Sequence, residues 1–286
     1  MYGAGAEYAL HSMLILATQS TPVSISDLSN YQGIPERFLA KIAYQSKIPK
    51  RIGTSHRIYH WFYCNQLIRL GRFRSNLHEA QLNLKLLRPF GANNLYKLRE
   101  IQQLYGINRI KDLEPNLKSL IDPSKFNLIL HPKSKGSARE WGLDNFGKFI
   151  NSIPKDKFKI FISGTSEDKN ALDPFLEKFK GEVIDITGQM NLASFISFIN
   201  AADGLIASST GPLHIAAALG KVAIGLYAPR RPIHPGRWSP IGPNSSYLVL
   251  NKECNKCKRS ATCECIQSIK PSEVILQLDK TFVNVG

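Results

Sequence analysis

The sequence predicts an α/β protein whose C-terminal half is a parallel sheet with helices on both faces. From Phe126 onward, short β-rich apolar runs alternate with amphipathic helical patterns, and this alternation is typical of βαβ units. The chain has 286 residues, of which 43% are hydrophobic and 21% charged, which suits a globular protein of two domains at about 100–200 residues each. Disordered, collagen-like and disulfide-scaffold proteins are excluded.

The first 43 residues predict a helical segment. Apolar residues recur at helical spacing over 7–17. A second helix follows, with Ser24 or Ser26 as its cap. After a turn at 32–35, a third helix carries Phe38, Leu39 and Ile42. Two helices joined by a glycine-containing turn have the spacing of a helix-turn-helix.

The middle region, residues 44–125, has too few predicted strands to form a complete sheet by itself. A basic stretch at 47–57 is followed by an apolar, helix-like run at 77–87 and then by a loop-rich stretch. Residues 112–123 have the composition of a linker into the last domain.

The last region, residues 126–286, is predicted to form one complete domain. The apolar periodicity of its helices distinguishes them from the β-rich runs. Strands are expected at 127–131, 158–163, 182–186, 204–208 and 222–227, and helices at 141–153, 192–202, 212–219 and 271–278.

Positive charge is concentrated in the middle of the chain. Lys and Arg number 37 against 22 Asp and Glu, a net charge of +15, and twelve basic residues but only two acidic ones lie between 41 and 100. Such a bias suits nucleic acid, an acidic membrane surface or a phosphorylated substrate, or it is a solvated basic face. No apolar window of about 18 residues predicts a membrane span. The apolar run at 8–17 lacks the basic start of a signal peptide, so a cytoplasmic location is expected.

Four of the five cysteines lie close together near the C-terminus, spaced C-x2-C-x5-C-x-C. The first pair fits a zinc site, but the second pair is spaced unusually for one. Free or reversibly oxidised thiols are the other interpretation, and no metal is expected. The cluster comprises Cys254, Cys257, Cys263 and Cys265.

The segment 204–220 predicts an anion site. A buried strand leads into the turn Ser208–Gly211, and Pro212 then opens a helix where its missing N–H has no cost. The free N–H groups and the dipole of that helix favour a diphosphate, and His214 in its first turn is a plausible donor. The segment is neither a Walker loop nor a G-x-G-x-x-G motif. An ordinary strand–helix connection is the alternative interpretation.

The motif at 209–214 resembles the signature of glycosyltransferase family 9, the heptosyltransferases of lipopolysaccharide core assembly. Three further motifs agree with that family, in order along the chain, at 51–57, 77–83 and 131–141. The cysteine cluster before a terminal helix is also common there. The similarity covers roughly residues 41–286.

This resemblance implies a GT-B-type fold, with a nucleotide-sugar donor, expected to be ADP-heptose, bound by a C-terminal Rossmann-like domain. It implies inverting displacement onto a phosphorylated lipid or oligosaccharide acceptor of the lipopolysaccharide core, with no cofactor or metal. Glu167 or Asp168 would bind the donor ribose. Ser209 stands where several family members have an Asp. The residues implied to hold the diphosphate are Ser209, Thr210, Gly211, Pro212, His214 and Arg139.

The resemblance also implies that the first, acceptor-binding domain is truncated, because only its last part, from about Ala43, is matched. No residue inherits the role of the general base that would deprotonate the acceptor, so weak or absent turnover is expected. The segment before it resembles the winged-helix repressor family of the iron–sulfur cluster assembly regulator, without the wing, dimer helix or cluster ligands. Two alternatives therefore remain open. One is a DNA-binding regulator with a sugar-nucleotide sensor domain, although a helix-turn-helix without its wing is a poor DNA reader and DNA is not the expected partner. The other is a non-functional gene fusion.

Overall fold

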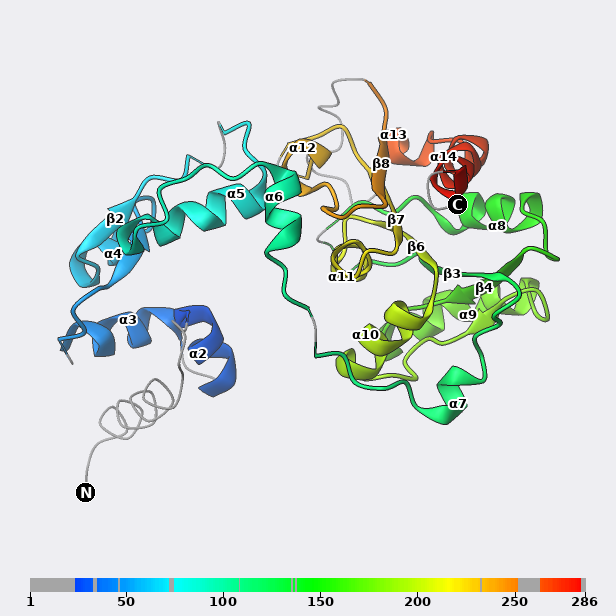
Figure 1. The fold of residues 1–286 in the computed structure, drawn as a ribbon, viewed down its shortest axis with the longest axis horizontal. Helices are drawn as coiled ribbons and strands as arrows, with labels where there is room; N and C mark the ends of the chain where they lie inside the picture. The colour runs from blue at the N-terminus through cyan, green and yellow to red at the C-terminus, as the bar shows by residue number, and fades with distance from the viewer. Residues whose placement is uncertain are drawn as a thin grey trace. The chain divides into compact units, whose positions relative to one another are not determined.

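The structure is a computed structural model that describes residues 24–32, 35–45, 47–71, 75–107, 109–134, 136, 138–231, 233–251 and 263–283. Contacts divide these residues into two compact units (Figure 1). The N-terminal unit comprises the described residues up to Ser75 together with Leu82–Leu95. The C-terminal unit comprises Asn76–Gln81 and the described residues from Tyr96 onward. The helix expected at 7–17 and the glycine turn at 33–34 lie outside the described residues. The expected domain boundaries at 43/44 and 125/126 stay predictions.

A six-stranded sheet forms the centre of the C-terminal unit, and every neighbouring pair of strands is parallel. The spatial order is β5-β4-β3-β6-β7-β8. The predicted α/β class with a parallel sheet is therefore confirmed. The strands are β3 (Phe126–His131), β4 (Phe158–Ile162), β5 (Ile184–Asp185), β6 (Gly204–Ser208), β7 (Val222–Tyr227) and β8 (Ser245–Val249).

Alternate side chains of the central strands enter two separate cores, one on each face of the sheet. On β3, Leu128 and Leu130 join one core, and Ile129 joins the other. The first core includes buried residues of α8 (Leu143–Ser152), α9 (Lys169–Lys178) and α14 (Pro271–Val283). The second includes residues of α10 (Leu192–Ala201) and α11 (Gly211–Ala218). Burial on both faces explains why these strands read as continuous apolar runs.

The remaining helices of the C-terminal unit are short. They are α6 (Leu98–Gln103), α7 (Pro115–Lys118), η2 (Ser166–Asp168), α12 (Pro235–Trp238) and α13 (Glu264–Gln267).

The start of α8 differs from the sequence prediction. Trp141, which is predicted within the helix, lies just before it. The Trp141 side chain is fully buried, and its Nε1–H donates to the Ile269 carbonyl at 2.8 Å.

The segment Asn76–Gln81 belongs to the C-terminal unit although the chain on either side of it belongs to the other. Its His78 ring nitrogen Nε2 lies 2.9 Å from the Ser239 carbonyl. Glu79 forms an ion pair with Arg237 at 2.7 Å, with side chains only 8% and 18% exposed. Such low exposure makes the pair part of the interior of the unit.

The N-terminal unit contains a two-stranded parallel sheet and short helices. The Ser24 Oγ accepts a hydrogen bond from the Asp27 N–H at 3.0 Å, which confirms Ser24 as the predicted cap. Among the described residues, no helix has the length and apolar character that crossing a membrane requires. The elements are α2 (Ile25–Gln32), α3 (Glu36–Gln45), β1 (Ile52–Thr54), α4 (Ile58–Tyr63), β2 (Gln66–Ile68), α5 (Glu79–Leu84), whose first residues count with the C-terminal unit, and η1 (Lys85–Phe90).

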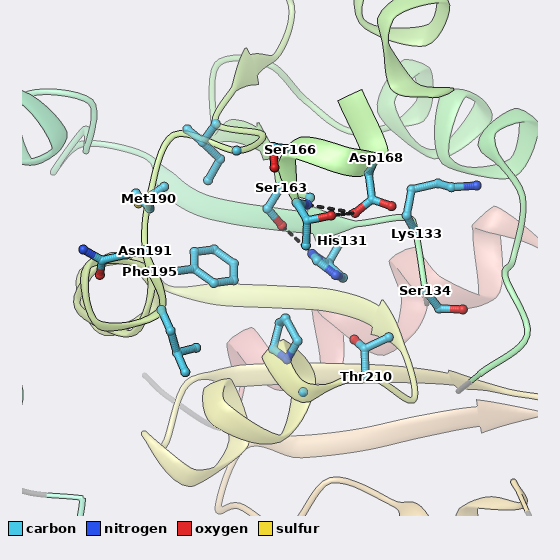
Figure 2. A pocket seen from close by; sticks show the side chains of 17 residues that line it. His131, Lys133, Ser134, Ser163, Ser166, Asp168, Met190, Asn191, Phe195 and Thr210 are labelled. Carbon is cyan, nitrogen blue, oxygen red and sulfur yellow. Dashed lines mark hydrogen bonds between the residues drawn. The ribbon is translucent and has the colours of Figure 1, made fainter. Parts of the chain in front are cut away.

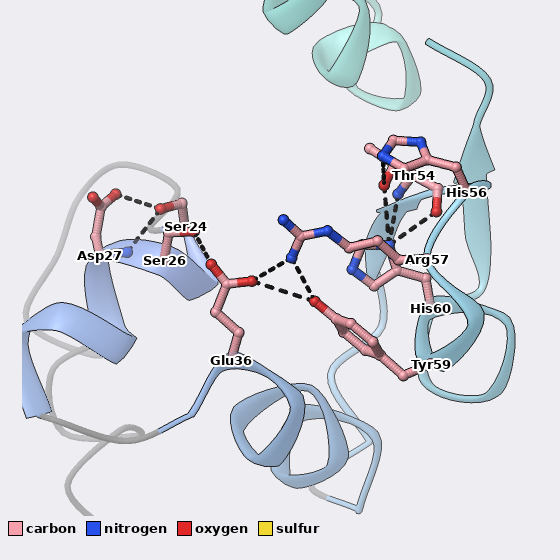
Figure 3. A network of polar contacts seen from close by, with 9 residues as sticks. All are labelled: Ser24, Ser26, Asp27, Glu36, Thr54, His56, Arg57, Tyr59 and His60. Atoms are coloured by element: carbon pink, nitrogen blue, oxygen red, sulfur yellow. Dashed lines mark hydrogen bonds and ion pairs between the residues drawn. The ribbon is translucent and has the colours of Figure 1, made fainter. Parts of the chain in front are cut away.

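Glu36, at the start of α3, joins three parts of this unit (Figure 3). Its carboxylate accepts hydrogen bonds from Ser26 on α2 and from the Arg57 guanidinium at 2.5 Å. The Tyr59 hydroxyl on α4 also donates to it at 3.3 Å. The hydrogen bond from Ser26 and the charge of Arg57 lower the pKa of Glu36, so its charge is retained well below neutral pH. Glu36 therefore links α2 to α3 and α3 to the β1–α4 segment.

Candidate functional site

The carboxyl ends of β3 and β6 mark the topological switch point of the sheet. From β3 the chain proceeds to β4 and β5 on one side, and from β6 to β7 and β8 on the other. Connections that leave in opposite directions open a crevice at the carboxyl ends of the two strands, which is where doubly wound sheets bind ligands. A cavity of about 450 Å³ lies there, lined by residues that follow β3, β4 and β6 (Figure 2).

The N-terminus of α11 forms one wall of this cavity. Thr210 is its N-cap, and Thr210, Gly211 and Pro212 all line the cavity. The Thr210 hydroxyl is buried and has no hydrogen-bond partner. A Cβ added to Gly211 would meet no atom within 4 Å, so the space in front of the helix is open. A ligand with anionic oxygens would satisfy both the free N–H groups of the first turn and the Thr210 hydroxyl.

His131, the last residue of β3, lies at the centre of the cavity lining (Figure 2). Its Nδ1 is 2.9 Å from the hydroxyl of Ser163, which directly follows β4. Burial lowers the pKa of His131 to about 4, and the charge of Asp168 opposes this only in part. The ring is therefore neutral at pH 7 and can offer a hydrogen bond to a ligand but not a positive charge.

Asp168 brings a carboxylate to the cavity. Its Oδ2 accepts hydrogen bonds from the N–H and the hydroxyl of Thr165, both at 2.8 Å, and this reciprocal cap fixes the side chain. A carboxylate held in this way can accept hydrogen bonds from sugar hydroxyl groups. Glu167, the alternative named from the sequence, is not among the residues that line the cavity.

Apolar side chains form the opposite wall. The ring of Phe195 on α10 lies 6.4 Å from that of His131, centroid to centroid, at a tilt of 35°. An apolar slot that ends in a few fixed polar groups suits a planar, partly polar ligand such as a nucleobase. The apolar residues of this wall are Ile186, Met190, Leu192 and Phe195.

Three residues of the predicted diphosphate set do not line this cavity. Ser209 is half-buried and hydrogen-bonds the Tyr227 hydroxyl. His214 lies further along α11, where burial and the neighbouring His78 lower its pKa to about 4. Arg139 is also half-buried and is not among the lining residues. The cation that does line the cavity is Lys133, which pairs with Glu140 at 2.7 Å.

The sequence motifs do not predict Lys133, Ser163 or the apolar wall as parts of the site, and they include His131 only as the first residue of the motif at 131–141. The available signal was positional, because His131 and Ser163 are the residues at which predicted buried strands end. Such positions meet at one edge of a parallel sheet.

The cysteine cluster contributes nothing to this site in the described residues. Cys263 and Cys265 are buried in the core beneath α14, and Cys254 and Cys257 lie outside the described residues. No group of three or more metal-ligating side chains is found in the part of the chain that the structure describes.

A doubly wound sheet with an open helix N-terminus, an apolar slot and a fixed carboxylate at its switch point has the arrangement in which α/β domains bind ligands. The family model of glycosyltransferase family 9 (heptosyltransferase) matches residues 40–266. The chain belongs to this family, as its motifs predicted. The match begins at residue 40, so the predicted repressor-like character of the preceding segment stays a prediction.

Two curated relatives from Haemophilus influenzae are similar to parts of the chain. A protein named as a glycosyltransferase, without a stated substrate, is 28% identical over 221 residues, covering 73% of this chain and 62% of its own length. The lipopolysaccharide core heptosyltransferase OpsX is 27% identical over 125 residues, covering 42% of this chain and 35% of its own length. The chain thus spans less than two thirds of these relatives.

Solved structures show the same fold. A glycosyltransferase family 9 protein from Veillonella parvula superposes with a TM-score of 0.67 at 16% identity, over 99% of this chain and 80% of its own. The ADP-heptose lipopolysaccharide heptosyltransferase II of E. coli gives 0.61 at 16% identity, over 87% and 74%. The fold is therefore GT-B-like, as expected.

Proposed function

We propose that this protein binds a nucleotide-diphosphate sugar, ADP-heptose, and transfers the sugar to a phosphorylated acceptor of the lipopolysaccharide core. Family membership supports the reaction class. The names of the E. coli structure and of OpsX, which mention ADP-heptose and the lipopolysaccharide core, support the donor and acceptor.

The observation that carries the proposal is the unsatisfied Thr210 hydroxyl at the N-terminus of α11. A buried hydroxyl without a partner costs about 1–3 kcal/mol, so its retention beside an open cavity favours a ligand that accepts its hydrogen bond. The donor diphosphate is such a ligand, and the partial positive charge of the helix N-terminus adds to its binding.

The rest of the cavity accommodates the nucleoside. Asp168 would accept hydrogen bonds from the ribose hydroxyls, and the base would lie against Met190 and Phe195. Neutral His131, held by Ser163, is positioned to hydrogen-bond the base or the diphosphate.

In the proposed reaction, the acceptor hydroxyl displaces the diphosphate from the anomeric carbon with inversion. The α11 N-terminus stabilises the negative charge that develops on the leaving diphosphate. Lys133, the cation among the lining residues, would add positive charge beside the diphosphate. The reaction needs no cofactor. The general base that receives the acceptor proton is unassigned among the described residues.

The acceptor side of the proposal concerns the N-terminal unit. From residue 37 to residue 78 the chain has nine Lys or Arg residues and no Asp or Glu, which suits a phosphorylated, lipid-linked acceptor. The protein would then act in the cytoplasm, at the inner face of the cytoplasmic membrane.

Calorimetric titration with ADP, UDP and GDP tests the donor site. We expect micromolar binding of ADP, and an affinity reduced about tenfold by Thr210→Val, since this substitution removes the hydroxyl proposed to bind the diphosphate. Ser246→Ala is the matched control, because its hydroxyl on β8 is also buried without a partner but lies outside the cavity lining. Equal ADP affinity in Thr210→Val and wild type, or tighter binding of UDP or GDP, would contradict the proposal.

A further inference from the structure

Helix α4 has one face fixed within the N-terminal unit. The Tyr59 hydroxyl points towards Glu36 (Figure 3). His60 Nδ1 accepts a hydrogen bond from the Thr54 N–H at 2.8 Å. The ring of Tyr63 meets that of Tyr44 edge-on, with centroids 6.1 Å apart. These contacts on Tyr59, His60 and Tyr63 fix the orientation of the helix about its axis.

The other face of α4 is apolar and exposed. Ile58, Trp61 and Phe62 are 79%, 64% and 70% exposed, and their i, i+3, i+4 spacing places them on one side of the helix. The indole N–H of Trp61 donates to the Ser55 carbonyl at 2.8 Å, so its polar atom is satisfied within the chain while its ring remains exposed. Three large apolar side chains clustered in this way mark an interaction surface.

The charge around α4 narrows the choice of partner. The nine basic residues of 37–78 include Arg57, which directly precedes α4, and Arg51, whose Nε donates to the carbonyl of Tyr63 at the end of α4 at 2.8 Å. Lys47, Lys50 and Arg69 are exposed. A second copy of the chain would bring like charges together, and nucleic acid offers no apolar environment to Ile58. An anionic bilayer offers an apolar layer beneath negative headgroups and so matches both features.

We propose that the exposed face of α4, formed by Ile58, Trp61 and Phe62, is a docking surface for an anionic lipid bilayer. The three side chains enter the headgroup region, where aromatic rings are favoured, and the surrounding Lys and Arg side chains contact the lipid phosphates. This surface would bring the protein to its lipid-linked acceptor. The expectation that the protein meets a membrane rests on the proposed function, whereas the apolar face and the surrounding charge do not.

Vesicle binding tests the surface with the intact chain. Wild-type protein is sedimented with vesicles of equal parts phosphatidylglycerol and phosphatidylcholine, and with phosphatidylcholine alone. We expect binding to the anionic vesicles only, and a partition coefficient reduced about tenfold or more in Ile58→Ser/Phe62→Ser. The matched control is Leu104→Ser/Leu276→Ser, which removes two apolar side chains that are each 57% exposed in the C-terminal unit.

Tryptophan fluorescence gives a second readout. Trp61 is the exposed one of the three tryptophans, since Trp141 is fully buried and Trp238 half-buried. A blue shift on adding anionic vesicles, absent in Trp61→Phe, is expected. Equal vesicle binding by Ile58→Ser/Phe62→Ser and wild type would overturn the proposal. The proposal would also be overturned if wild-type protein bound no vesicles and instead formed a dimer, or bound duplex DNA, in a way that the double variant abolished. ADP binding by the double variant is expected to equal that of wild type. Loss of vesicle binding alone would therefore leave the proposed donor site standing.

Discussion

Replacing Glu79 by Gln should destabilise the C-terminal unit by about 2–3 kcal/mol. The Glu79 and Arg237 side chains are 8% and 18% exposed and 2.7 Å apart. Removing one partner of a fully buried pair costs about 3–5 kcal/mol, because a charge is left uncompensated. An exposed pair contributes about 0–1 kcal/mol. With Arg237 retaining some contact with water, the expected loss lies between these ranges.

The assay is urea unfolding followed by tryptophan fluorescence in a Trp61→Phe background. The two remaining tryptophans, Trp141 and Trp238, both belong to the C-terminal unit, so the signal reports on that unit alone. For a unit of this size the expected loss corresponds to a decrease in Tm of roughly 5–10 °C. Glu177→Gln is the matched control, since its pair with Lys180 has side chains 74% and 77% exposed and should contribute below about 0.5 kcal/mol.

A double-mutant cycle with Arg237→Gln isolates the interaction itself. We expect a coupling free energy above about 1 kcal/mol between residues 79 and 237. The reasoning is refuted if Glu79→Gln is no more destabilising than Glu177→Gln, or if the two substitutions at the buried pair are additive.

Two further predictions concern burial. Folding lowers the pKa of His131 from its ordinary 6.5 to about 4. Between these two pH values the unfolded chain binds a proton at His131 and the native protein does not, so the free energy of unfolding decreases as the pH falls from 6.5 to 4. His131→Asn should reduce by about 2 kcal/mol the loss of unfolding free energy between pH 7 and pH 5, and an unchanged loss would argue against a buried, neutral ring. Gly242→Ala would place a Cβ 2.2 Å from the Ala217 carbonyl oxygen. Urea unfolding should show a loss of about 2–3 kcal/mol, whereas a loss near zero would mean that the loop moves freely.

The central strands could be predicted from the sequence because burial on both faces makes them distinctive. The predicted limits of β6 and β7 agree with the structure to the residue. Strand β8 was missed because it lies at the edge of the sheet, has the sequence Ser-Ser-Tyr-Leu-Val and is at most half-buried. An edge strand packed on one side lacks the continuous apolar run that identified its neighbours.

The site could be predicted only in part. The strand–turn–helix around Thr210 follows from local chemistry, since small residues and a proline at the helix start favour one backbone path. Which of Lys133 and Arg139, or of Glu167 and Asp168, enters the cavity depends on side-chain directions set by distant contacts, such as the Thr165 cap on Asp168. Sequence spacing does not contain that information. The roles of these residues, like the truncation of the first domain, stay predictions.

The position of Asn76–Gln81 constrains how the C-terminal unit could be transferred to another protein. A chimera joined near residue 120 would separate Ser239 and Arg237 from the His78 and Glu79 that they contact. The C-terminal unit is therefore not one continuous stretch of chain, and a transplanted version would have to include this short upstream segment.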